Sequence, residues 1–370
     1  MVGEEQSNGK TPVRVWCDGC YDMVHFGHAN QLRQAKEMGD YLIVGVHTDQ
    51  EILQHKGPPV YTEQERYHLV RGIKWVDEVV EGAPYITNVQ TLRKHNCDFC
   101  VHGDDLSIGA DGRDTYQEVR DANMYKECKR TAGISTTDLV GRMLLLTKQH
   151  HSASSQLSDD QRKTSTALAT DSKASSPWTG VSQFLASTST IMLFQEGRSR
   201  KPTDRVVYCS GSFDLFHPGH LCFLEAAKAL GDYLIVGIHD DQTINQYRGE
   251  NHPIQNLHER VLTTLAYKPV NEVLIGAPYS VTQEIIDQFK ISCVAEGKPS
   301  PPDPVTGLDC YQLPKQLKIC VTVDANSDLT TDVIIERILQ NRRLFQKRNR
   351  DKEAKEIKVI ETLAKTDSTQ

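Results

Sequence analysis

The stretch Asp22-Met23-Val24-His25-Phe26-Gly27-His28 returns as Asp214-Leu215-Phe216-His217-Pro218-Gly219-His220, at an offset of 192 residues. The stretch from Gly39 to His47 likewise returns from Gly231 to His239 with a single change, Val46 to Ile238. Solenoid repeats have periods of roughly 20 to 50 residues, so a repeat of this length is a whole domain. We therefore expect two globular domains of one fold.

Later pairs of matching stretches have a slightly larger offset. Gly82-Ala83-Pro84-Tyr85 pairs with Gly276-Ala277-Pro278-Tyr279, and Thr136-Thr137-Asp138 pairs with Thr330-Thr331-Asp332, both at an offset of 194 residues. The increase of the offset from 192 to 194 residues predicts a two-residue insertion in the second copy, in the loop from Gly249 to Pro253.

The apolar pattern of each copy alternates between strands and helices. Continuous apolar runs of strand length are typical of parallel strands covered on both faces. Apolar residues at three and four spacing predict helices, and Thr62-x-x-Glu65 and Asn256-x-x-Glu259 have the spacing of capping boxes. We expect tandem Rossmann-like, doubly wound α/β domains, which bind ligands beyond the carboxyl ends of the strands. The main expected strands are 13–17, 41–46, 78–80 and 99–102, then 206–209, 233–238, 272–275 and 293–295, with helices at 27–38 and 219–230.

Composition sets the domain boundaries. Residues 149–176 are rich in Ser, Thr, Ala, Gln and Asp and contain no Phe, Trp or Tyr, as expected of a linker that cannot bury a core. An apolar cluster from Pro177 to Leu185 predicts a docking segment at its end. We expect domains at 12–148 and 205–345, a linker at 149–204 and a charged tail at 346–370.

The length, net charge and hydrophobic content of the chain predict a cytoplasmic enzyme. The chain has 370 residues, a net charge of −7 and 38 % hydrophobic content, with neither an expected signal peptide nor a run of membrane-spanning length. Its acidic balance disfavours a nucleic-acid partner. Two Cys-x-x-Cys pairs, Cys17 with Cys20 and Cys97 with Cys100, could indicate a zinc or redox site. Their counterparts in the second copy are Cys209 with Ser212 and Cys293 with Glu296, so the pairing is not kept. We therefore expect these cysteines to be small buried hydrophobic residues, and we expect no metal held by the protein.

The H-x-G-H segments predict a phosphate site. Each places two imidazoles at the start of a helix, where free backbone N–H groups and the helix dipole attract anions. The glycines of the preceding loops, Gly19-Cys20-Tyr21 and Gly211-Ser212-Phe213, let backbone amides approach a phosphate closely, and the glycine between the histidines is expected to do the same. Because the segment is repeated in the same context, we expect it to bind a triphosphate.

A second motif, Arg130-Thr131-Ala132-Gly133-Ile134-Ser135-Thr136-Thr137-Asp138, offers a turn glycine, hydroxyls and a fixed positive charge. It also has the pattern of a capped helix start, which is compatible with phosphate binding. Together with H-x-G-H it resembles the R-T-x-G-I-S-T-[ST]-D motif of the cytidylyltransferases of phospholipid synthesis. The resemblance implies that Lys56 reaches the α-phosphate and that four residues face an acceptor's ammonium group: Tyr85, Asp104, Asp105 and Tyr116.

Tandem domains joined by a linker are similar to the members of this family that use phosphoethanolamine. The resemblance implies transfer of CMP from CTP to phosphoethanolamine by in-line displacement, giving CDP-ethanolamine and pyrophosphate, with Mg²⁺ carried on the triphosphate. Phosphocholine or glycerol phosphate as acceptor, a non-catalytic CTP-binding regulator and a tRNA-directed enzyme are the alternatives. The mixed Lys and Glu pattern from Arg350 to Lys365 predicts no obligate membrane binding, and a homodimer or an intramolecular pseudo-dimer could form.

The candidate site residues follow from these motifs. The expected catalytic residues are His25, His28, Lys56, Arg130 and Thr136. The expected CTP contacts are Gly19, Cys20, Tyr21, His28, Ala29, Asn30, Gln31, Gly133, Ile134, Ser135 and Thr136, then Ser212, Phe213, His217, His220, Leu221, Cys222, Phe223, Lys298, Ser327, Asp328, Leu329 and Thr330.

The second copy departs from the family pattern. Arg248 replaces Lys56, Lys298 replaces Asp104, and residues 324–329 replace the Arg-Thr-x-Gly-Ile-Ser run. The changes predict that the second domain still binds a nucleotide while its acceptor binding is altered.

Overall fold

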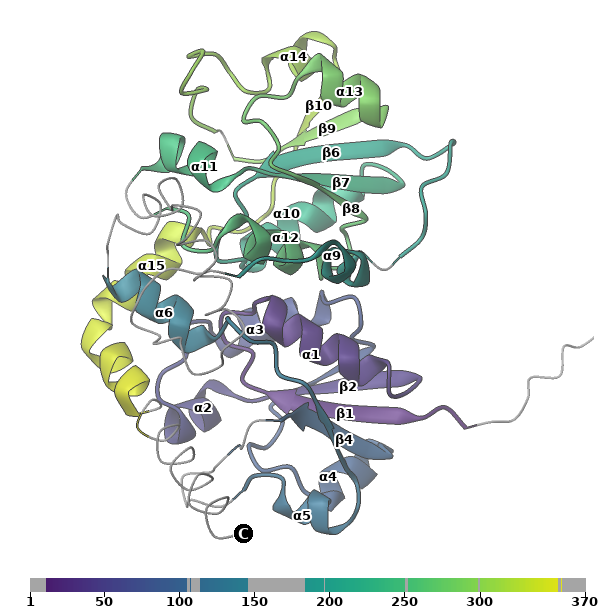
Figure 1. The fold of residues 1–370 in the computed structure, drawn as a ribbon, viewed down its shortest axis with the longest axis vertical. Coiled ribbons are helices and arrows are strands. Elements are labelled where there is room, and N and C mark those ends of the chain that lie inside the picture. Colours follow the sequence, from purple (N-terminus) through teal and green to yellow (C-terminus); the bar gives the residue numbers. More distant parts are fainter. Residues whose placement is uncertain are drawn as a thin grey trace, which may run out of the picture.

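Two similar halves stack on each other in the computed structural model (Figure 1). The structure describes residues 11–104, 107, 114–145, 184–195, 197–249, 252–298, 300–351 and 354. Each half contains a five-stranded, all-parallel sheet with helices on its faces. This confirms the tandem Rossmann-like α/β fold.

The two sheets have the same strand order. The first is β3-β2-β1-β4-β5, and the second, read from its far edge, is β8-β7-β6-β9-β10. Neighbouring strands pair in parallel, and helices cover both faces of each sheet (Figure 1). The central strands β2 and β7 are therefore continuous apolar runs that are almost fully buried. The strands are β1 (Arg14–Gly19), β2 (Tyr41–Val46), β3 (Glu78–Glu81), β4 (Phe99–Gly103), β5 (Tyr125–Cys128), β6 (Val206–Gly211), β7 (Tyr233–Ile238), β8 (Glu272–Ile275), β9 (Cys293–Glu296) and β10 (Cys320–Thr322).

Side-chain caps fix the starts of many of the helices. The capping boxes expected from Thr62 with Glu65 and from Asn256 with Glu259 are both formed. The helices are α1 (Phe26–Lys36), α2 (Asp49–His55), α3 (Glu63–Arg71), α4 (Val89–Lys94), α5 (Gln117–Asp121), α6 (Thr136–Leu145), α9 (Thr188–Phe194), α10 (Pro218–Lys228), α11 (Asp241–Arg248), α12 (Leu257–Leu265), α13 (Gln283–Phe289), α14 (Gln312–Gln316) and α15 (Thr331–Gln340).

Equivalent segments of the two halves meet at the junction. Ile73 forms an antiparallel bridge with Tyr267, its own counterpart at an offset of 194 residues. Helix α1 contacts α12, α10 contacts α3, and α6 contacts α15. One apolar core cluster contains residues of both halves. The two halves therefore pack against each other through equivalent elements.

Two reciprocal ion pairs cross this junction. Arg142 of α6 binds Glu259 of α12 at 2.9 Å, and Arg337 of α15 binds Glu65 of α3 at 2.8 Å. The first pair is buried, with side-chain exposures of 1 % and 0 %, whereas the second is partly exposed, at 33 % and 17 %. The two ion pairs thus occupy equivalent positions in the two halves but differ in their exposure to solvent.

The end of the predicted linker docks at the junction. Phe184 packs on Phe26 with ring centroids 4.3 Å apart, and Phe194 of α9 packs edge-on against Trp75 at 5.4 Å. Residues 149–183 of the linker lie outside the described residues. Within the part of the chain that the structure describes, no helix is long and apolar enough to cross a membrane.

Candidate active site

The two histidines of the first half cap α1 together. The Nδ1 atom of His25 accepts the Gly27 N–H at 3.1 Å, and Nδ1 of His28 accepts the His25 N–H at 3.4 Å. Their rings stack with centroids 4.0 Å apart. Because both Nδ1 atoms act as acceptors, the neutral imidazoles carry their protons on Nε2. Each ring therefore offers one N–H donor, at the helix N-terminus where an anion is favoured.

The loop before each helix holds two non-glycine residues in the left-handed region. Tyr21 and Met23 have φ of 48° and 47°, and Phe213 and Leu215 both have φ of 48°. Such residues cost about 1–3 kcal/mol each and persist where the surrounding structure enforces them. The sequence analysis assigned the loop's freedom to its glycines and missed this feature, since the side chains of these residues give no sign of it.

Gly27 brings the two motifs into contact. A Cβ atom at this position would lie 2.9 Å from the His25 ring and 2.9 Å from Cγ2 of Ile134. In the second half, a Cβ at Gly219 would lie 2.6 Å from the Leu329 carbonyl oxygen. The glycine between the histidines thus has a packing role that phosphate approach alone did not predict.

The second motif is tied to the start of the first domain. The Asn30 amide donates to the Thr131 hydroxyl at 2.9 Å, and the Arg130 N–H donates to the Asp104 carboxylate at 3.0 Å. The Thr136 hydroxyl donates to the Asp22 carbonyl at 2.9 Å. Residues 130–136 therefore lie beside the histidine loop. The hydrogen bond from the Thr136 hydroxyl to Asp22 holds the start of α6 against this loop.

The alignment of this motif between the halves needs a correction. Thr331, rather than Thr330, donates its hydroxyl to the carbonyl of Asp214, at 3.0 Å. Ser135 and Thr330 likewise make matching bonds, accepting the N–H groups of Asp138 and Val333. The expected pairing of Thr136 with Thr330 is wrong by one residue, because matching the Thr-Thr-Asp letters ignored a further one-residue shift before α15.

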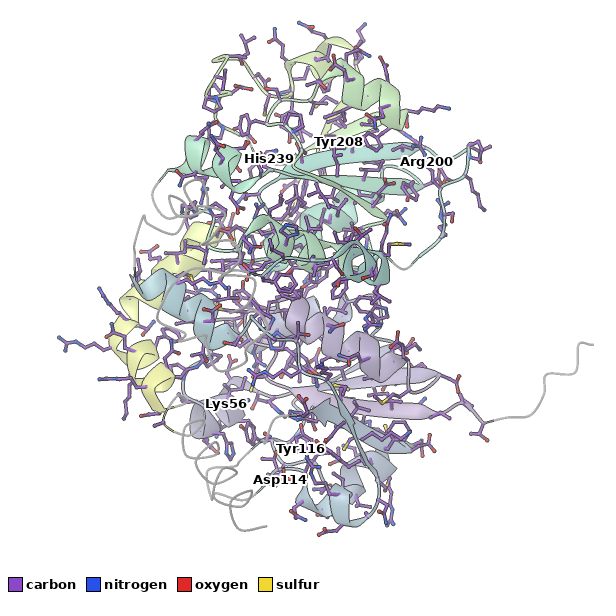
Figure 2. All side chains as sticks on the ribbon, viewed as in Figure 1. Lys56, Asp114, Tyr116, Arg200, Tyr208 and His239 are labelled. Carbon is purple, nitrogen blue, oxygen red and sulfur yellow. The ribbon has the colours of Figure 1, made fainter. Side chains whose placement is uncertain are left out.

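Lys56 and Tyr85 lie together at the end of α2. The Lys56 ammonium is 5.8 Å from the centre of the Tyr85 ring, and the His55 ring stacks on Tyr85 with centroids 3.9 Å apart. Burial raises the pKa of Tyr85 while the charge of Lys56 opposes that rise. Figure 2 shows Lys56 and Tyr116 at the same end of the first half. The predicted phosphate lysine and a predicted acceptor residue are therefore neighbours.

A buried carboxylate that the sequence analysis did not select lies at the end of β1. Asp18 accepts hydrogen bonds from Tyr116, Thr87 and, at 2.8 Å, the indole N–H of Trp16. Its counterpart in the second half is Ser210, so the charge is lost there. The available signal was an acidic residue inside an apolar strand that ends at a ligand-binding edge. Asp105 lies outside the described residues.

The histidine pair of the second half is stacked and desolvated. The rings of His217 and His220 stack at 3.7 Å, and Nδ1 of His220 accepts the His217 N–H at 3.4 Å. Burial lowers the pKa of His220 to about 4 and that of His217 well below its usual value. Lys298 lies 3.9 Å from Asp328, and Arg248 binds Asp332 at 2.6 Å.

Two expected nucleotide contacts of the second half have side chains at the junction. Leu221 is fully buried, and its side chain lies 2.6 Å from where a Cβ on Gly72 of the first half would be. The Cys222 thiol lies within 4.8 Å of ligand atoms of His68 and Glu225. Both side chains thus face the junction between the halves.

This group of His68, Cys222 and Glu225 is the metal-compatible cluster found among the described residues. It borders a cavity of about 500 Å³ that Arg71, Lys228 and Lys268 also line, and their charge opposes a bound cation. All ten cysteines of the chain are free thiols, with those of the two Cys-x-x-Cys pairs buried except for the half-buried Cys20.

A doubly wound sheet that leads into an H-x-G-H helix start, with a phosphate motif packed on it, defines a nucleotidyltransferase. A family model described as cytidylyltransferase-like matches residues 16–142 and 208–355. Ethanolamine-phosphate cytidylyltransferase of Mus musculus is 54 % identical over 94 % of this chain and 91 % of its own length. The Dictyostelium discoideum protein of the same name is 51 % identical over 96 % and 98 %. The chain belongs to the ethanolamine-phosphate cytidylyltransferase family.

A relative of another name covers a smaller part of the chain. Choline-phosphate cytidylyltransferase A of Homo sapiens is 41 % identical over 38 % of this chain and 40 % of its own length. The matches to the two ethanolamine-phosphate cytidylyltransferases, in contrast, extend over nearly the whole chain.

Proposed function

We propose that this enzyme transfers CMP from CTP to phosphoethanolamine, giving CDP-ethanolamine and pyrophosphate for phosphatidylethanolamine synthesis. The observation that carries the proposal is the histidine pair of the first half. It presents two Nε2–H donors at the start of α1, with Ile134 of the second motif packed against Gly27. The relatives that match nearly the whole chain have this activity in their names.

The proposed reaction is a direct displacement. A phosphate oxygen of the acceptor attacks the α-phosphorus of CTP, the bond to the β-phosphate oxygen breaks, and pyrophosphate leaves. His25 and His28 donate hydrogen bonds to the triphosphate, while Lys56 and Arg130 offset the charge that develops on it. Positioning and charge neutralisation suffice, so no covalent enzyme intermediate is invoked.

Magnesium enters this proposal as part of the nucleotide substrate. The carboxylates nearest the histidine loop are already engaged, Asp18 by three donors and Asp22 by the backbone amides of Val60 and Tyr61. They do not form a cage with free ligand positions. Mg²⁺ is therefore expected to arrive on the triphosphate, whose charge it reduces.

The second half is proposed to bind a nucleotide without serving the acceptor. It keeps the strained loop and the stacked histidines. It lacks the Asp18 carboxylate, and its Arg248 is paired with Asp332. An ammonium group therefore has fewer negative partners there. The enzyme is proposed to act in the cytoplasm as a pseudo-dimer, without nucleic-acid or obligate membrane partners.

Substitution of His28 and His220 tests the assignment. His28→Asn keeps a side-chain acceptor at the position of Nδ1 for the α1 cap and removes the Nε2–H donor, so turnover should fall by about 10²–10³-fold with an unchanged melting temperature. His220→Asn is the matched variant in the second half and should lower turnover much less. Labelled CTP with a panel of phosphoethanolamine, phosphocholine and glycerol phosphate measures both. A larger loss for His220→Asn reverses the roles of the halves, and CTP binding without any product identifies a regulator.

A further inference from the structure

The C-terminal helix of the second half reaches the active site of the first half. Residues 342–351 are helical and follow α15 past α6 towards α2 (Figure 1). Phe345 and Asn349 of this helix are buried, and the Asn349 amide donates to the Thr137 carbonyl of the second motif at 3.3 Å. Residues 346–349, which the sequence analysis assigned to a charged tail, thus include packed positions.

Arg348 of this helix connects the two phosphate-handling loops. Its Nη1 atom donates to the Pro58 carbonyl at 2.8 Å and to the Asp22 carboxylate at 3.3 Å. Its side chain packs 3.6–3.7 Å from the position of a Cβ on Gly57, whose φ of +91° marks a tight turn directly after Lys56. Arg348 therefore touches both the loop that carries Lys56 and the loop that carries the histidines.

The Asp22 carboxylate is the centre of this arrangement. It accepts the N–H groups of Val60 at 3.0 Å and Tyr61 at 2.9 Å. The loop that carries Lys56 is thus held at two places, by Asp22 at the amides of Val60 and Tyr61 and by Arg348 at the carbonyl of Pro58. The guanidinium also offsets the buried negative charge of Asp22, three residues before His25, where an anion is expected to bind.

Among the residues that the structure describes, the second half is built differently at the same place. Asp214 accepts the N–H groups of Ile254 and Gln255, and His252 of its own loop lies 3.9 Å away. The arginine that braces the loop of the first half comes instead from the far end of the chain. This contrast points to a dependence of the first site on the second half.

We propose that Arg348 is a positioning residue, which holds the loop of residues 56–61 so that Lys56 can reach the nucleotide phosphate. The proposal rests on the catalytic role proposed above for Lys56. A guanidinium can serve Pro58 and Asp22 together, because it presents several N–H donors in a fixed plane.

Kinetics of Arg348→Ala and Arg348→Lys, with Lys347→Ala as the exposed neighbour control, test the proposal. We expect kcat/KM for CTP to fall at least tenfold in Arg348→Ala, to recover partly in Arg348→Lys, and to stay unchanged in Lys347→Ala. In a Lys56→Ala background, Arg348→Ala should cause little further loss, because it acts through Lys56. Wild-type kinetics in Arg348→Ala, or an equal loss in both backgrounds, would overturn the proposal.

Hydrogen exchange provides a readout that needs no turnover. In the full-length protein, Arg348→Ala should accelerate exchange at the amides of Val60 and Tyr61, while Ile254 and Gln255 of the second half stay protected. Unchanged protection of Val60 and Tyr61 refutes the bracing role even if the enzyme proves active. Accelerated exchange in a protein that makes no CDP-ethanolamine would instead support the bracing and count against the proposed function alone.

Discussion

Individual side chains of the site differ in how far sequence reasoning could reach them. His25 and His28 were predicted because their spacing and their repetition are visible in the letters. Asp18 was not, because its partners Thr87 and Tyr116 lie far away in the chain and only the fold brings them together. The tautomer of each histidine was also out of reach, since it depends on the backbone geometry of the cap.

Buried histidines give the second half a predicted sensitivity to acid. Burial lowers the pKa of His239 to about 4, as it does for His220. An unfolded histidine has a pKa of about 6.5, so below this pH the unfolded chain binds more protons than the folded one, and the free energy of unfolding falls as the pH drops towards 4. Each such group contributes up to about 1.4 kcal/mol per pH unit. Urea unfolding between pH 7 and 5 measures the slope, which His239→Gln should reduce; an identical slope in the variant contradicts the assignment.

Among the elements, the central strands and one edge strand of each sheet were predictable, whereas the other edge strand of each sheet was not. Strands β2 and β7 have the predicted bounds because their apolar runs are uninterrupted. Strands β5 and β10 lie at the other sheet edges and each exposes two of its residues, so no apolar pattern marks them. The alignment of α6 with α15 failed by one residue for a similar reason, because hydrogen bonds rather than letters define the start of each helix.

The helix start of α1 gives a test at this scale. Gly27→Ala adds a methyl group 2.9 Å from the His25 ring and from Ile134, so it should move the histidines off the second motif and lower kcat/KM at least tenfold. The matched change Gly219→Ala in α10 should weaken nucleotide binding by the second half with a smaller effect on turnover. Steady-state kinetics and equilibrium CTP binding measure the two effects, and full activity of Gly27→Ala would show that the loop absorbs the methyl group.

In the whole molecule, the pseudo-dimer was one of two arrangements that the repeat allowed. The sequence offered no way to find the ion pairs across the junction, because each joins residues more than a hundred positions apart. The two ion pairs also differ in burial, because Arg142 and Glu259 are buried whereas Arg337 is partly exposed.

This inequality predicts different costs for equivalent substitutions. Arg142→Ala removes the guanidinium that neutralises the buried Glu259 carboxylate and should lower the free energy of unfolding by about 3–5 kcal/mol. Arg337→Ala, its pseudo-symmetric partner, should cost about 1 kcal/mol or less because water can solvate Glu65. Urea titrations of both variants make the comparison. Equal losses would mean that burial does not distinguish the two pairs.

The bridge between Ile73 and Tyr267 has a consequence for how such a molecule can evolve. In an assembly of two identical chains, a substitution on the axis appears twice and meets itself. Covalent tandem copies escape that constraint: position 72 is glycine while its twin at 266 is alanine, and Leu221 fills the room that only one of them leaves. A tandem chain can therefore change one copy at the junction while the other copy keeps its own residue.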